Sequence, residues 1–490
     1  MNINKEAQLI NSRLIRSPDE LYIRVPAKLP KAVNHLDLDD LKQIDSDPSV
    51  AKELCLYLCS FLQSTYLNEE ISTVGLHSDI LMEVFGCKYR KIIDVLERGT
   101  PEKGSIIQCD GNWKVGIKSI HYWFADAYTK ERGNYLVPYK FKKVKVQTLF
   151  IENLNERMLE DRGNPIINNL YHVYSMVGLP STQHLREKGK KLVAQQKTSK
   201  KGKLYKFCNR NRSRFSEEEL KTISFIEDGI RRFTLLTEKG FIPPHCQGKK
   251  AGNRISDTFT SLNSWIREEI TLNGRQVVEC DFKCLHPNLA MSVYGGGIQY
   301  LTHKSVAEYC GIDIENKAAL SKFKTDHLAF FNKKVPDMKR SKAIHEFYLT
   351  HEPEMLSRIQ NEKDIKRDHT VTCTKLFAKE VEIMTKCIEK LNAQDVYVLY
   401  VFDALLCDPH NQTIVEHVMN ETAFESGVYT ATYDMNEVFD QESSEGLEPI
   451  ESAFGIQDTG HTSESKIRTQ NAPLSLRGGL SLDSLLGLSA

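Results

Sequence analysis

Residues 274–297 read GRQVVECDFKCLHPNLAMSVYGGG, and this stretch decides the fold that the sequence predicts. Val277, Val278 and Cys280 make a short apolar run, which is typical of a buried strand. Asp281 follows at the point where that strand should end. Apolar residues then recur at helical spacing, at Leu285, Leu289, Ala290 and Val293. The stretch therefore predicts a strand, a carboxylate and a helix, in that order.

A second carboxylate, Asp403, follows another strand-like run. Residues 396–402 read VYVLYVF, and such a run of β-branched and aromatic residues is typical of a strand. If the two strands are neighbours, Asp281 and Asp403 form a metal site with the oxygen ligands that Mg²⁺ prefers. Each aspartate alone has a simpler interpretation, because Asp at a strand end commonly bonds its own backbone in a turn. Only the two aspartates together, and neither residue alone, indicate a metal site.

Length and composition limit the classes of protein to which this chain can belong. The chain has 490 residues, of which 40% are hydrophobic and 27% charged, so about two or three globular domains are expected. It contains no long apolar run, and its first residues lack the plan of a signal peptide. We therefore expect a cytoplasmic protein with no membrane partner. The twelve cysteines form no CxxC pair, which favours reduced, buried thiols over zinc knuckles or disulfides.

The net charge is zero, but the basic residues are clustered. Between Arg186 and Arg214 the only acidic residue is Glu187, and we predict a basic arm or linker over residues 181–215. Tyr205 and Phe207 interleave with the cations, which favours nucleic acid because aromatic rings stack on bases. The alternative is a solvated loop. The candidate nucleic-acid contacts in this segment are Lys200, Lys201, Lys203, Lys206, Arg210 and Arg212.

The N-terminal region, residues 1–180, contains a pattern that resembles a winged helix-turn-helix at about 72–125. Residues 78–85 and 88–98 predict two short amphipathic helices separated by Gly86. The alternating residues 105–124 then predict a β-hairpin. In this interpretation Lys88 and Arg90 lie near the start of a recognition helix. The alternative is an ordinary helical hairpin packed on a β-hairpin, with both cations solvated.

The C-terminal residues 436–490 are poor in aromatic residues and rich in Ser, Glu, Gly and Thr. Such a composition predicts a disordered tail. Its last residues, 480–490, read LSLDSLLGLSA and are apolar enough to dock on a protein partner as a short motif.

The second half of the chain resembles the family A polymerases, which include DNA polymerase I and the single-subunit phage-type RNA polymerases. The resemblance spans roughly residues 252–418. It is carried by Arg254-Ile255-Ser256, Leu262-Asn263, Ile266-Arg267, Asp281-Phe282 and Val401-Phe402-Asp403-Ala404. Lys324 stands where the family has a lysine on a fingers helix, and His286 stands in place of a glutamate near the incoming sugar. The helix at 375–392 precedes the second aspartate as in the family, and we expect Glu380 and Glu382 on its solvated face.

The resemblance implies an α+β fold over residues 216–435, with a polymerase-like palm, an antiparallel sheet and helical fingers. The N-terminal region before it would be α/β. Asp281 and Asp403 would be the catalytic residues and the Mg²⁺ ligands. Lys324, His286 and Phe282 would contact the nucleotide, while Arg254 and Arg267 would contact the primer-template or brace the palm.

The implied activity is template-directed nucleotidyl transfer, as a DNA or RNA polymerase in the replication or transcription of a phage or other mobile element. Its partners would be nucleoside triphosphates and a primer-template or promoter DNA, in the host cytoplasm if a phage encodes the chain. Two Mg²⁺ ions suit such a reaction because negative charge accumulates on the transferring phosphate. The alternative is a non-catalytic DNA-binding replication initiator or regulator with a degenerate palm. Retention of both aspartates favours the enzyme, and the poor match around Lys324 favours the alternative.

Overall fold

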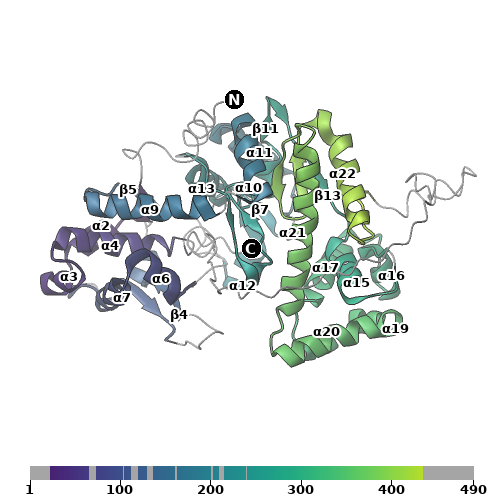
Figure 1. Ribbon diagram of the computed structural model, residues 1–490, viewed down its shortest axis with the longest axis horizontal. Helices are drawn as coiled ribbons and strands as arrows, with labels where there is room; N and C mark the ends of the chain where they lie inside the picture. The colour runs from purple at the N-terminus through teal and green to yellow at the C-terminus, as the bar shows by residue number, and fades with distance from the viewer. Residues whose placement is uncertain are drawn as a thin grey trace, which may run out of the picture.

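The structure is a computed structural model that describes residues 22–63, 65, 73–102, 104–111, 120–129, 136–160, 163–199, 202–208, 215–238, 240–298 and 300–433. Its elements pack around two separate hydrophobic cores (Figure 1). The first core runs from Ile23 to Val146 and the second from Ile166 to Val428. Within these residues, no helix combines the length and apolar character that a membrane crossing requires. The predicted tail at 436–490 lies outside the described residues.

The first core is built from short helices and strands. In chain order these are β1 (Ile23–Pro26), α2 (Leu29–Asn34), α3 (Leu38–Ile44), α4 (Pro48–Ser60), β2 (Val74–Leu76), α6 (Ser78–Phe85), α7 (Lys88–Arg98), β3 (Ile107–Cys109), β4 (Ile120–Phe124), α8 (Asp126–Thr129), β5 (Leu136–Tyr139) and α9 (Val144–Glu160). The strands β2, β4 and β3 form an antiparallel sheet in that spatial order. The helix α6 ends at Gly86, whose φ of 59° suits a residue without a side chain.

The second core begins with α10 (Pro165–Val173), β6 (Val177–Gly178), α11 (Thr182–Ala194), β7 (Leu204–Lys206), α12 (Glu217–Lys221), β8 (Ile223–Phe225) and α13 (Ile226–Thr237). Because α10 packs in this core, the structural boundary lies before residue 166 and not near 180. The side chain of Asn169 fixes this packing, since its amide nitrogen donates to Val398 O at 2.7 Å and its oxygen accepts from Val398 N at 3.2 Å.

The segment predicted as a basic arm is folded where the structure describes it. The helix α11 buries Leu185 completely, and Leu192 and Val193 pack on the same core. Gly189 lies against Ile226 of α13 so closely that a Cβ there would clash. The strand β7 pairs in parallel with β8. These apolar residues recur at helical spacing among the cations, and this explains why the segment docks instead of forming a linker.

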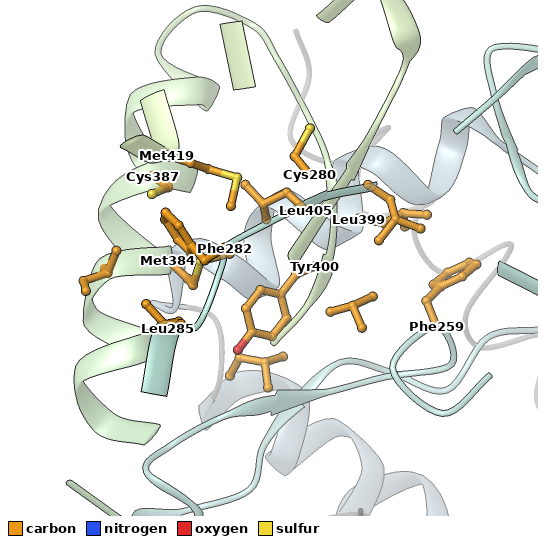
Figure 2. Packing of buried hydrophobic residues seen from close by; sticks show 14 of the residues in the cluster. Phe259, Cys280, Phe282, Leu285, Met384, Cys387, Leu399, Tyr400, Leu405 and Met419 are labelled. Carbon is orange, nitrogen blue, oxygen red and sulfur yellow. The ribbon is translucent and has the colours of Figure 1, made fainter. Parts of the chain in front are cut away.

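A three-stranded antiparallel sheet lies at the centre of the second core. Its order is β13 (Val278–Asp281), β15 (Ala404–Cys407) and β14 (Leu399–Val401). The helix α22 (Gln412–Glu425) contacts β13 and β15, and α10 contacts β14. The long α21 (Val371–Asn392) runs beside them (Figure 1) and contacts α15 (Leu285–Tyr294). Figure 2 shows Phe282 and Leu285 beside Met384 and Cys387 of α21 and Met419 of α22. This packing holds the end of β13 against α21.

The remaining elements complete the second core. They are β9 (His245–Cys246), β10 (Ile255–Ser256), α14 (Ser264–Arg267), β11 (Thr271–Leu272), β12 (Arg275–Gln276), α16 (His303–Tyr309), α17 (Lys317–Phe330), α18 (Val335–Arg340), α19 (Lys342–His351) and α20 (Pro353–Lys366), with 3₁₀ turns η2 (Tyr174–Met176), η4 (Lys249–Ala251) and η5 (Pro409–Asn411). Helices α16 to α20 pack on one another and connect α15 to α21. The described residues therefore combine many helices with small, mainly antiparallel sheets.

Candidate active site

The two predicted aspartates lie at the same end of the central sheet. Asp281 is the last residue of β13, and Asp403 lies in the turn that joins β14 to β15. In the register of the sheet Asp281 is the partner of Ala404, the residue directly after Asp403. The Cα atoms of the two aspartates are therefore within about 10 Å of each other, given the usual spacings along and between strands. Both aspartates are half-buried.

A strained backbone supports this arrangement. The hairpin turn consists of Phe402 and Asp403, and Phe402 has a φ of 58°. A bulky residue in the left-handed region costs on the order of 1 kcal/mol or more, and such outliers are concentrated at functional sites. The ring of Phe402 faces the guanidinium of Arg254, whose Cζ lies 4.8 Å from the ring centroid. The strained turn is thus held by a cation–π contact next to Asp403.

A buried ionic network adjoins the turn. Arg254 Nε and Nη2 donate to the two carboxylate oxygens of Glu380 at 2.8 and 2.5 Å. His286 Nε2 lies 2.8 Å from Glu380 Oε2 and 3.2 Å from Arg254 Nη2. This nitrogen can donate to Glu380 or accept from Arg254, but the neutral ring cannot do both. The Glu380 side chain is 0% exposed, so its charge depends on these two neighbours.

The network sets the pKa values around Asp403. Burial opposes ionisation of Glu380, but the charge of Arg254 and the bond from His286 hold the pKa of Glu380 below its usual range. Burial and then the charge of Glu380 raise the pKa of Asp403, while His286 and Arg254 act in the opposite direction. Asp403 therefore keeps its proton more readily than an ordinary aspartate does, and a bound cation would favour its ionised carboxylate.

The prediction that Glu380 lies on a solvated helix face is wrong. Glu380 shares its face of α21 with the buried residues Leu376, Ile383, Met384 and Cys387. The sequence contains the signal for this, since a charged residue falls on the apolar stripe of the helix and must find a buried partner. Glu382, by contrast, is 46% exposed and bonds Lys379 and Lys386 on the same helix.

The structure places Phe282 and Arg267 in the core and not at a ligand surface. Phe282 is 3% exposed and lies beside Met384 of α21 (Figure 2). Arg267 is 8% exposed and donates from Nη1 to Leu262 O at 2.6 Å, and burial lowers the pKa of its guanidinium. Of the two roles expected for Arg254 and Arg267, these contacts correspond to bracing the fold.

Lys324 lies in α17, and its side chain is exposed. Burial, then the charge of Lys324, then that of His286 lower the pKa of His303 to about 4. Lys324 on α17 and His286 near the start of α15 are thus both close enough to His303 for their charges to act on it. His286 itself is held in the Glu380 network described above.

The predicted nucleic-acid contacts are occupied within the protein where they are described. Lys88 Nζ lies 2.7 Å from Asp45 Oδ2, and the Arg90 guanidinium stacks on the ring of Tyr89. Lys206 Nζ lies 4.6 Å from the centroid of the Phe215 ring. Lys203 is half-buried beside β7. Four further predicted contacts lie outside the described residues, namely Lys200, Lys201, Arg210 and Arg212.

The chain matches no protein-family model and no curated protein. Among solved structures it is similar to the POL domain of Pol1 from M. smegmatis, in a complex with DNA primer-template and dNTP. The sequence identity is 13%, the TM-score is 0.32, and the alignment covers 45% of this chain and 50% of that chain. The chain thus spans about half the length of that domain, and functional assignment depends on its own residues.

Proposed function

We propose that this protein is a nucleotidyltransferase that extends a nucleic-acid strand on a template, with Asp281 and Asp403 as its metal ligands. One observation carries the proposal: the β13–β15 register makes Asp281 the partner of the residue next to Asp403. Two carboxylates that are 122 positions apart in the sequence therefore lie at the same end of one sheet. Two such acids at the end of an antiparallel sheet suit a two-metal phosphoryl-transfer site.

The donor set fits Mg²⁺, because both proposed ligands supply hard carboxylate oxygens. The raised pKa of Asp403 is consistent with this fit, since an adjacent cation would offset the burial and the charge of Glu380. Bound between these aspartates, Mg²⁺ would activate a primer hydroxyl and neutralise charge on the phosphates.

Other residues of the chain have positioning or binding roles in this proposal. The exposed Lys324 would bind the triphosphate as a point charge from α17. Arg254 would hold Glu380 and the Phe402 turn in place, and so fix Asp403. His286 would close the network at the start of α15. Arg254, Glu380 and His286 are thus positioning residues.

The N-terminal unit would bind the template duplex. Two observations support this proposal, namely the element order α4, β2, α6, α7, β3, β4 and the sheet order β2-β4-β3. A winged helix-turn-helix would need this order and would use α7 as its recognition helix. Lys88 is paired with Asp45, and Arg98 of the same helix is paired with Asp40. DNA phosphates would therefore compete with these acids for the cations of α7.

The test is extension of a primed DNA or RNA template by the full chain with Mg²⁺. Asp281→Asn and Asp403→Asn should each lower incorporation by about 100-fold or more, because the lost charge stabilises the transition state. Asp395→Asn is the matched control, since Asp395 is exposed, has a φ of 56° that Asn tolerates, and precedes β14. Control activity should equal that of the wild type.

A second candidate function is non-catalytic DNA binding by a replication initiator or regulator. Two observations favour it. The element order of the N-terminal unit suits DNA binding, and His286, which stands in place of a glutamate near the incoming sugar, is hydrogen-bonded to Glu380. This function predicts that the wild type, Asp281→Asn and Asp403→Asn bind DNA with equal affinity and that none of them incorporates nucleotides. That result would exclude the polymerase.

A further inference from the structure

We propose that Cys284, His303 and His327 bind one divalent transition-metal ion of the zinc class, at a site separate from the Asp281–Asp403 pair. One ligand atom from each residue, a thiol sulfur or a ring nitrogen, lies within 4.8 Å of the other two. A thiolate and two imidazoles are soft or borderline ligands, which select Zn²⁺ or Co²⁺ over Mg²⁺.

The two imidazoles face each other across the proposed site. Their Nδ1 atoms are 3.0 Å apart, and the rings meet edge to face with centroids 5.0 Å apart. A tetrahedral Zn²⁺ binds nitrogen at about 2.0 to 2.1 Å and sulfur at about 2.3 Å. The two Nδ1 atoms are thus close to the required spacing, and the Cys284 sulfur lies within 4.8 Å of a ligand nitrogen of each ring.

A second contact orients one of the ligands. His327 is 0% exposed, and its Nε2 lies 2.6 Å from the hydroxyl of Tyr348. This bond occupies the nitrogen that faces away from His303 and leaves Nδ1 directed at the site. Metal-binding histidines are commonly oriented by such a partner on the other ring nitrogen.

The three residues come from three separate elements. Cys284 is the N-cap of α15 and adopts a φ of 54°, an uncommon conformation for a residue with a side chain. His303 begins α16, and His327 lies in the last turns of α17. A metal ion there would therefore tie α17, which carries Lys324, to the segment that follows Asp281.

The test uses Co²⁺ alone as a spectroscopic probe on the untagged full chain, after treatment with a chelator. One equivalent of Co²⁺ should give the intense visible bands of tetrahedral coordination and a thiolate-to-cobalt charge-transfer band, and Zn²⁺ should displace it. Cys284→Ser should abolish the charge-transfer band. Cys109→Ser is the matched control, because Cys109 is a part-buried free cysteine in the other core. This control should bind Co²⁺ as the wild type does.

Circular dichroism would show whether Cys284→Ser folds. If it does not, two further variants test the site. His303→Gln replaces a half-buried ligand and should weaken Co²⁺ binding at least 10-fold. Tyr348→Phe keeps all three ligands and should weaken it about 10-fold, as expected for loss of an orienting contact. The absence of stoichiometric Co²⁺ binding by the wild type, or an unchanged spectrum in the folded Cys284 or His303 variant, would overturn the proposal. No readout here requires nucleotide incorporation, so the outcome is independent of the polymerase assay.

Discussion

Arg254 and Glu380 are 126 positions apart in the sequence, yet they form a two-pronged ion pair in the second core. The Arg254 side chain is 12% exposed, and that of Glu380 is 0% exposed. The guanidinium carbon of Arg254 also lies 3.5 Å from the ring centroid of Phe377 and 4.8 Å from that of Phe402. The pair therefore connects the residue directly before β10, the helix α21 and the turn that carries Asp403.

Loss of one partner of this pair should destabilise the second core. Glu380→Gln removes a buried charge and leaves Arg254 without its counterion, at a cost of about 3 to 5 kcal/mol. Hydrogen exchange of peptides from β13 and β15 would measure this change in the free energy of opening. Glu382→Gln, in an exposed pair on the same helix, should change it by at most about 1 kcal/mol. Equal effects of the two variants would contradict a structural role for the Arg254–Glu380 pair.

A methyl group at Gly252 should disturb the same region. Gly252 has a φ of 65°, and an added Cβ would clash with Phe377 and lie 2.5 Å from the backbone nitrogen of Ala378. Gly252→Ala should therefore cost overpacking of about 1 to 3 kcal/mol in addition to backbone strain. Gly274→Ala provides the comparison, because Gly274 has a φ of 79° but open space around it. Thermal unfolding should show a larger loss for Gly252→Ala, and a loss no larger than that of Gly274→Ala would refute the close approach to α21.

Because the pKa of Asp403 is raised, we expect the stability of the folded protein to depend on pH and on Mg²⁺. Above the ordinary value of 3.8 the unfolded chain has released this proton while the folded protein retains it, so stability falls as pH rises through the folded pKa. Asp403→Asn should therefore be more stable than the wild type at neutral pH, and the difference should vanish near pH 4. Mg²⁺ should raise the melting temperature of the wild type more than that of the variant. A variant that gains as much from Mg²⁺ as the wild type would exclude Asp403 as a ligand.

In the first core, Asp45 should confer stability that is lost in acid. Burial raises the pKa of Asp45, but hydrogen bonds from Lys145 and Lys88, both 2.7 Å long, bring it below its usual range. Its contribution is therefore complete above pH of about 4 and is lost as pH falls through the depressed pKa. Since both lysines are partly exposed, Asp45→Asn should cost about 1 to 2 kcal/mol at neutral pH.

Urea unfolding at several pH values would measure the effect of Asp45→Asn. Asp47→Asn is its control, because Asn can still cap α4 where Asp47 accepts from Ser49 N at 2.8 Å. The control should be the less destabilised of the two. A loss for Asp45→Asn that stayed constant down to pH 2 would contradict the linkage.

Local patterns in the sequence predict the central elements of the second core. The apolar run before Asp281 becomes β13, and the helical spacing after it becomes α15. The run before Asp403 contains β14, although this strand is shorter than predicted and returns at once as β15. These features depend on side chains a few positions apart, so periodicity is enough to find them.

Only the tertiary structure decides which of these residues meet. Three pairings join segments that are distant in the sequence. Asp281 is in register with Ala404, Glu380 is buried against Arg254, and Cys284 lies close to His303 and His327. The same packing buries Phe282, for which the resemblance implies a nucleotide contact, and it buries Arg267 in contacts that correspond to the bracing role. Such pairings are selected by the burial of apolar faces and the neutralisation of buried charge over the whole core. The sequence alone determines the candidate aspartates and their strands, while the fold determines that they lie at the same end of one sheet.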